Sequence, residues 1–297
     1  MVSAFLVLVP AVPYGVLLMA APGMSTSLFP PIADETAHAG PLDVEEGGAS
    51  PLSARAVRER SRGWEWKSLE TPGWKLLMAE HAVVRGDAPL ETLRASGVYL
   101  EAFREMLSRS LGGDVEGIMF SLRVFGDPRE FRAYASLLGA PSAESLYDPR
   151  SQEIVVCHDP SRGASWLQRT LAHEFTHAYM DRVWKRTDPL WLCEGLAEYF
   201  ANHEVVDGRL VPGRLDRRAL LLLSLEEPTP LGRFLRLRRD EMYGPAFPLH
   251  YAQAWSLAHH LMASRDGTLD LLLRGDPPKD LDLLERGWRE HLKKLND

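Results

Sequence analysis

The stretch Leu171-Ala172-His173-Glu174-Phe175-Thr176-His177 decides how this 297-residue chain is interpreted. Its two histidines are four residues apart, so on a helix both imidazoles project from one face and reach one metal ion. Glu174 lies between them and leans over the position that the protein leaves open on such a metal. The pattern HExxH also arises by chance in roughly one or two of every hundred chains with this histidine content, so a second signal is needed.

The second signal is the stretch Trp191-Leu192-Cys193-Glu194-Gly195-Leu196-Ala197-Glu198-Tyr199-Phe200. It supplies Glu194 on another predicted helix, with Glu198 one turn later on the same face. Two histidines and one glutamate form a standard ligand set of catalytic zinc. We therefore predict that His173, His177 and Glu194 bind Zn²⁺; the alternative is a pair of core histidines without a metal.

The other acidic side chains near the motif have predicted roles of their own. Glu174 is the expected general base, which takes a proton from water and passes it to the leaving amine. Glu198 is expected to accept the free ring N–H of a ligating histidine, and the alternative is a surface glutamate. Asp181, four residues after His177, competes for that contact, although we expect it to be exposed near the helix end.

A tyrosine further along the chain is the candidate for stabilising a tetrahedral oxyanion, which needs a donor beyond the metal. Tyr251 begins an apolar helical stretch, with Tyr243 and His250 behind it. The alternative is a core tyrosine on a packing helix. His259 and His260 are adjacent and face different directions on a helix, so we interpret them as structural or exposed.

Composition limits the classes of function. The net charge is −7 and the isoelectric point is about 5.8, which gives no electrostatic reason to expect a nucleic-acid partner, because such partners usually demand a basic face. Apolar residues make up 45% of the chain, enough for a large core. Cys157 and Cys193 are too few for a disulfide framework, so they are two buried thiols or a single bridge.

The N-terminal part reads as a targeting segment and a linker. Residues 1–22 carry no charge, and the apolar run 4–21 predicts a signal peptide or an anchor with possible membrane association. Export to the periplasm, the exterior or a membrane is expected from this. A signal peptide normally begins with Lys or Arg, but none precedes Arg55. The alternative is therefore a misassigned translation start and a cytoplasmic protein. Residues 23–62, rich in Pro, Gly, Ala and Ser, are expected to be a flexible linker.

Hydrophobic periodicity predicts alternating strands and helices beyond the linker. The expected elements are one or two strands within 64–79, a helix capped by Asp87 with Pro89 in its first turn, a strand at 118–124, a helix from Asp127-Pro128, a turn at Tyr147 to Arg150, a strand at 153–157, the motif helix, a helix capped by Asp188-Pro189, a hairpin at 204–211, and helices within 214–225, 253–263 and 281–295.

The motifs HEFTH (173–177) and WLCEGLAEYF (191–200) resemble those of the gluzincin branch of the peptidase MA-like zinc metallopeptidases, whose second motif commonly reads WLNEGxAEY. The chain is also similar to bacterial domains of unknown function in that superfamily, over roughly residues 64–262. The resemblance implies a small mixed sheet with the active helix beneath its edge strand, zinc at the three predicted ligands, and Glu174 as the base. Cys193 stands where the pattern usually has Asn, and the interval between the motifs is short.

These observations predict an α+β fold: a zincin-like domain over 63–212, with a small mixed β-sheet, followed by a mainly helical subdomain over 213–297. The predicted function is zinc-dependent hydrolysis of a peptide or protein substrate by an endopeptidase, because all three metal ligands and the base are present. The GxMEN motif of aminopeptidases is missing, which argues against N-terminal specificity. The alternatives are a non-catalytic, zinc-stabilised binding or scaffold protein and a zinc hydrolase of a non-peptide amide. No feature favours a particular oligomeric state.

Overall fold

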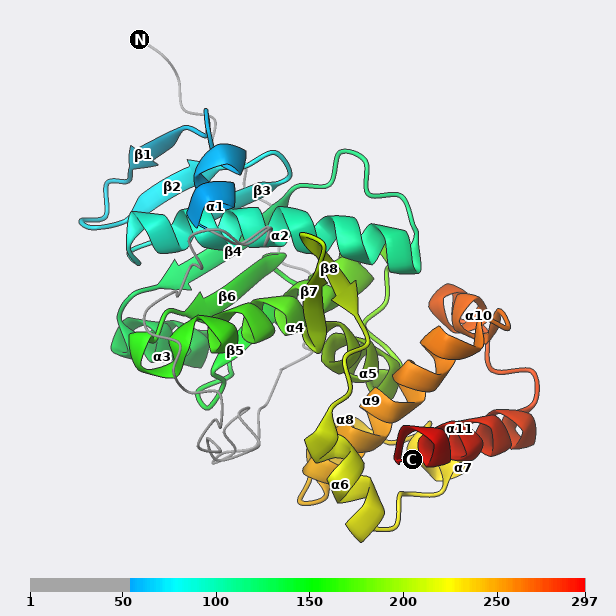
Figure 1. Ribbon diagram of the computed structural model, residues 1–297. Helices are drawn as coiled ribbons and strands as arrows, with labels where there is room; N and C mark the ends of the chain where they lie inside the picture. Colours follow the sequence, from blue (N-terminus) through cyan, green and yellow to red (C-terminus); the bar gives the residue numbers. More distant parts are fainter. Residues whose placement is uncertain (1–53, 297) are drawn as a thin grey trace, which may run out of the picture.

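The computed structural model describes residues 54–296 and has an α+β fold with a six-stranded mixed sheet (Figure 1). The strands are β1 (Trp66–Ser68), β2 (Lys75–Met78), β3 (Ala82–Gly86), β4 (Phe120–Phe125), β5 (Ser145–Asp148) and β6 (Glu153–Cys157). Their order in the sheet is β1-β2-β3-β4-β6-β5. The signal peptide or anchor predicted for residues 1–22, and the linker up to residue 53, lie outside the described residues.

The three central strands, β3, β4 and β6, run parallel, and the others pair antiparallel. Strand β6 is buried along its whole length because helices cover both faces of the sheet. Ile154 and Val156 face the main apolar core, whereas Val155 and Cys157 face a smaller cluster on the other side. The short strand β5 pairs with β6 alone and so forms one edge of the sheet.

Two long helices cover one face of the sheet and a shorter helix covers the other. They are α2 (Leu90–Leu111) and α4 (Gly163–Trp184) on one face, with α3 (Pro128–Leu137) opposite. Helix α4 carries the HExxH motif and packs against both β6 and the edge strand β5. A 3-10 turn, η1 (Pro160–Arg162), leads from β6 into α4. The motif is thereby held beneath the edge of the sheet.

The rest of the chain is a small hairpin and a group of helices. Its elements are α5 (Leu190–Ala201), β7 (His203–Val206), β8 (Arg209–Pro212), α6 (Arg217–Leu225), α7 (Leu231–Phe234), α8 (Arg239–Met242), α9 (Phe247–Ser264), α10 (Thr268–Arg274) and α11 (Leu281–Asn296). Helices α5 and α9 lie in close contact. Gly195 makes this possible, since a Cβ there would overlap the carbonyl oxygen of Ala254.

The predicted helix caps at Asp87 and Asp188 are wrong, whereas the helix predicted from Asp127-Pro128 is confirmed as α3. Asp127 accepts a hydrogen bond from the backbone N–H of Arg129 at 2.7 Å, with proline in the first turn. Before α2 and α5 a proline itself occupies the N-cap position, without a side-chain cap. Asp87 instead accepts from the N–H of Gly126, and so ties α2 to the end of β4.

Three further predictions differ from the structure. Tyr147 and Asp148 lie in β5 rather than in a turn, because they pair with Ile154 and Glu153 across the sheet. Strand β3 has no counterpart among the expected elements. Residues 54–60 form helix α1, with Val57 buried, so the linker prediction does not hold for the last part of 23–62.

One cluster of buried apolar side chains extends from β2 to α11, so the sheet and the C-terminal helices share a core.

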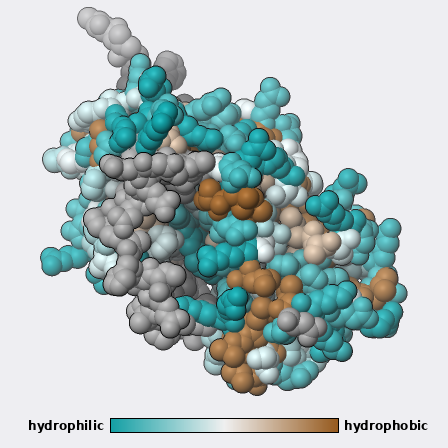
Figure 2. Space-filling view, in the orientation of Figure 1, coloured by the Kyte–Doolittle hydropathy of each residue, from teal (hydrophilic) through white to brown (hydrophobic). Residues whose placement is uncertain are grey.

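Both cysteines are buried and free, which excludes the predicted alternative of a bridge between them. Among residues 54–296 we find no helix that is both long and apolar enough to cross a membrane. On the outer surface, exposed apolar side chains gather over the β7–β8 hairpin and over α6 (Figure 2).

Candidate metal site

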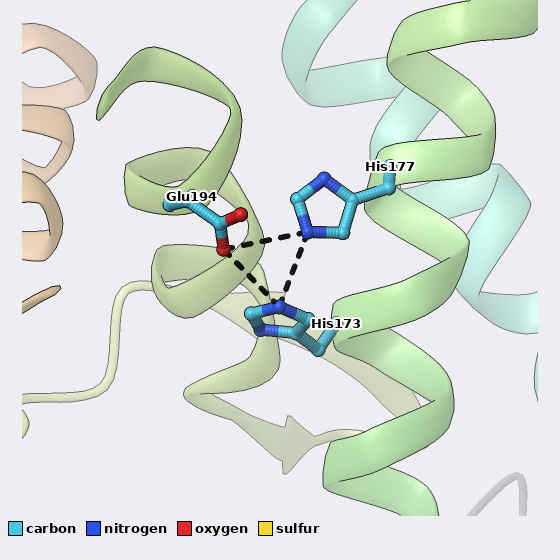
Figure 3. Close-up of side chains that lie close together, drawn as sticks. All are labelled: His173, His177 and Glu194. Carbon is cyan, nitrogen blue, oxygen red and sulfur yellow. Dashed lines mark hydrogen bonds and ion pairs between the residues drawn. The ribbon is translucent and has the colours of Figure 1, made fainter. Parts of the chain in front are cut away.

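The three predicted metal ligands lie together between α4 and α5 (Figure 3). The Nε2 atoms of His173 and His177 are 3.1 Å apart. Each of them is 3.5 Å from Oε2 of Glu194. Among the described residues these form the one group of three or more His, Cys, Asp or Glu side chains arranged to hold a metal ion.

Zinc fits this arrangement on three grounds. Ligand atoms bound tetrahedrally at 2.0 to 2.2 Å lie about 3.3 to 3.6 Å from one another, close to the three separations found here. In addition, the Glu194 side chain is only 6% exposed, and its Oε2 is buried without a hydrogen-bond partner. An orphaned buried carboxylate oxygen is costly unless a cation faces it. The donor set of two imidazoles and one carboxylate is one that catalytic zinc adopts.

The electrostatics of the site depend on one buried cluster of opposite charges. Burial lowers the pKa of His173, but the nearby carboxylates of Glu194 and Glu198 outweigh it and hold that pKa well above the ordinary value. Burial likewise raises the pKa of Glu194, but His177 and His173 outweigh it and hold this pKa well below the ordinary value. A cation bound between these groups would take the place of the imidazolium proton, because metal binding at His and Glu side chains releases protons.

Glu198 makes the contact predicted for it. Its Oε1 lies 3.0 Å from Nδ1 of His173, which leaves Nε2 of that ring facing Glu194 and His177. Its other oxygen accepts a hydrogen bond from Arg169 at 2.6 Å, and Arg169 also donates to Asn202. A carboxylate on the second ring nitrogen fixes the tautomer and orientation of a ligating histidine.

Glu174 is held by the edge strand. The hydroxyl of Ser145, on β5, donates a hydrogen bond of 2.6 Å to Oε1 of Glu174. Glu174 is 7% exposed and lies between the two histidines on α4. The edge of the sheet and the predicted base are thus linked directly.

Two tyrosines approach Glu194 from the C-terminal helices. Tyr243, directly after α8, donates a hydrogen bond of 2.5 Å to Oε1 of Glu194. Tyr251, on α9, lies next to it, with a ring-centroid separation of 6.3 Å. Burial and the charge of Glu194 hold the pKa of both tyrosines well above the ordinary value, so both hydroxyls keep their protons. The structure therefore brings Tyr251 to the site, with Tyr243 nearer to the ligand.

Other sequence candidates lie away from the metal ligands. Asp181 is neither exposed nor bonded to a ligating histidine, because it accepts a hydrogen bond of 2.6 Å from Tyr147. His259 and His260 are half-buried on α9, as a structural role requires. Nδ1 of His259 lies 2.8 Å from Nε2 of His291 on α11.

Three residues with contacts in the site were missing from the sequence prediction or had no role in it: Ser145, Arg169 and Tyr243. Arg169 had a usable signal, since it precedes His173 by one helical turn on the same face. Ser145 and Tyr243 had none, because their contacts depend on how β5 and α8 pack against the motif helices.

Comparison with known proteins gives one family match. Residues 167–275 match a family described as "Protein of unknown function (DUF1570)". The matched segment runs from α4 to α10 and includes both motifs, Tyr243 and Tyr251. No curated protein matches the chain.

Proposed function

We propose that this protein is a zinc-dependent metallopeptidase with a zincin-like fold, in which Glu174 acts as general base. One observation carries the proposal: the buried, unpartnered Oε2 of Glu194 faces the Nε2 atoms of the two motif histidines, each at 3.5 Å. His173, His177 and Glu194 would hold the ion. Zinc bound by such a set supplies a Lewis acid that polarises a carbonyl group and makes water more acidic.

The side chains around the ion divide the remaining tasks. With Ser145 bonded to Oε1 of Glu174, the other oxygen, Oε2, takes the proton from the attacking water and returns it to the leaving amine nitrogen. Glu198 keeps the ring of His173 in one orientation. Tyr251, which keeps its proton and lies next to Tyr243, would donate a hydrogen bond to the developing oxyanion.

The edge strand supports a peptide as the substrate. Strand β5 is the last strand of the sheet, and Ser145 on this strand touches the proposed base. An extended chain that paired with β5 would pass beside Glu174 with its backbone fixed by regular hydrogen bonds. Such pairing is independent of chain ends, which favours an endopeptidase.

Metal content and peptide cleavage test the proposal together. We expect the purified full chain to contain about one zinc per molecule, because the three ligands together form a site for a single ion. We also expect the chain to cleave an unbiased peptide library. A chelator should abolish this cleavage, and added zinc should restore it. A chain that binds zinc but cleaves no peptide would indicate a scaffold protein, or, if a metabolite amide were hydrolysed, a non-peptide amidase. A chain without zinc would contradict the proposal altogether.

Replacing Ser145 with Ala is expected to lower kcat about tenfold while zinc content stays the same. A hydrogen bond to a charged group contributes roughly 1.5 to 3 kcal/mol, and part of it is lost when Glu174 is free to rotate. The measurement is steady-state kinetics on a cleaved peptide. Ser145→Thr is the matched control, since it keeps the hydroxyl and suits a strand; equal kcat values for the Ala variant and wild type would refute the contact's role.

A further inference from the structure

The two carboxylate oxygens of Glu194 have different surroundings. Oε1 accepts the short hydrogen bond from Tyr243. Oε2 has no hydrogen-bond partner and faces Nε2 of His173 and of His177 at equal distances of 3.5 Å. The carboxylate is almost completely buried, so water does not equalise the two positions. Oε1 of Glu194 is therefore already hydrogen-bonded, and Oε2 is the oxygen left for an ion.

We infer that Tyr243 is a positioning residue for the metal ligand Glu194: its hydroxyl occupies Oε1 and presents Oε2 alone to the ion. The inference rests on the metal site of the proposed function, and it assigns to this site a residue from outside both motifs. One-oxygen binding by Glu194 leaves a coordination position for water and substrate, which binding by both oxygens would use.

The fold holds Tyr243 rigidly enough for this task. It follows α8, a single helical turn in which Met242 is completely buried. The start of that turn is fixed by a hydrogen bond of 3.0 Å from the backbone N–H of Arg238 to Glu241. The ring of Tyr243 then contacts the Arg239 guanidinium, 5.4 Å from its centroid, and the ring of Tyr251, 6.3 Å away between centroids. These contacts fix the direction in which the hydroxyl points.

Loss of the hydroxyl would act on the ligand in two ways. Oε1 of Glu194 would be left buried without its donor, and the carboxylate would be free to turn about its last torsion. Mutating a residue that hydrogen-bonds to a metal ligand typically weakens metal binding about 10-fold to 100-fold. We expect a loss of this size in Tyr243→Phe.

Zinc affinity of the full chain, measured by competition with a chromogenic chelator, tests the inference without an activity assay. Tyr147→Phe is the matched control, because that hydroxyl also donates to a carboxylate, Asp181, that is not a ligand. We expect the dissociation constant for zinc to rise 10-fold to 100-fold in Tyr243→Phe and to stay within about twofold in Tyr147→Phe. Equal affinities of Tyr243→Phe and wild type would overturn the role of Tyr243 and leave the proposed function standing. Absence of zinc binding by wild type would overturn both.

A second measurement needs no variant and therefore covers the case in which Tyr243→Phe fails to fold. A crystal structure of the zinc-loaded wild-type chain is expected to have one Glu194 oxygen bonded to the ion and the other bonded to Tyr243. Coordination by both oxygens, or a Tyr243 hydroxyl turned away from Glu194, would refute the inference.

Discussion

Replacing Glu174 with Gln is expected to lower kcat by a factor of about 10² to 10⁴, the usual contribution of a general base. Gln has nearly the same shape as Glu, and its carbonyl oxygen still accepts from Ser145, but it takes no proton from water. Because Glu174 is not one of the three ligands, we expect zinc content to stay at the wild-type level. Single-turnover cleavage of a peptide, with metal analysis of the same sample, measures both quantities.

Two further variants make the interpretation of Glu174→Gln specific. Asp181→Asn changes an acid to an amide on the same helix, at a side chain bonded to Tyr147, and is expected to keep wild-type kcat. Glu194→Gln removes the charge of a ligand and is expected to lose zinc and activity together. If Glu174→Gln lost zinc as well, or cleaved peptide at the wild-type rate, the role of base would have to be abandoned.

Replacing Gly195 with Ala is expected to destabilise the fold by about 1 to 2 kcal/mol and to weaken zinc binding. The added methyl group overlaps the backbone carbonyl of Ala254, so α5 and α9 must move apart. Such overpacking typically costs about 1 to 3 kcal/mol, and the better helix propensity of Ala returns up to about 1 kcal/mol. The same displacement separates Glu194 on α5 from Tyr251 on α9. Urea unfolding of the metal-free chain and zinc competition measure the two effects.

Gly232 provides the control for this substitution. It also lies in a helix, α7, but a Cβ there meets only the side chain of Leu281, at the ordinary contact distance of 3.4 Å. We expect Gly232→Ala to leave the free energy of unfolding within about 0.5 kcal/mol of wild type or to raise it slightly. Equal stability of the two Ala variants would show that the α5–α9 contact tolerates an extra methyl group.

Residues within one helix could be placed from the sequence because helical geometry is local. The four-residue spacing of His173 and His177 sets both rings on one face of α4, and the same spacing sets Glu194 and Glu198 on one face of α5. Two glutamates at this spacing would repel each other, and in the structure His173 contacts both of them. Caps were harder to place, because a proline in the N-cap position displaces the preceding aspartate by one residue or more.

Contacts between distant segments could not be derived in this way. Ser145 is 29 residues from Glu174, and Tyr243 is 49 residues from Glu194. Their positions depend on the edge pairing of β5 and on the packing of α8, neither of which has a periodic signal. The sequence Tyr147-Asp148-Pro149-Arg150 has the composition of a turn, but strand pairing with β6 overrides that local preference for its first two residues.

The apolar core that the sheet shares with α9 and α11 makes the metal site part of one cooperative unit. A ligand that binds only the native state adds RT ln(1 + [L]/Kd) to the free energy of unfolding, about 2.7 kcal/mol at a hundredfold excess over Kd. Since α4, α5, α8 and α9 all contribute to the surroundings of Glu194, this increment is distributed over the whole described chain. Zinc bound at the proposed site is thus expected to protect the whole described part of the chain, and not only the site, against heat, denaturant and proteases.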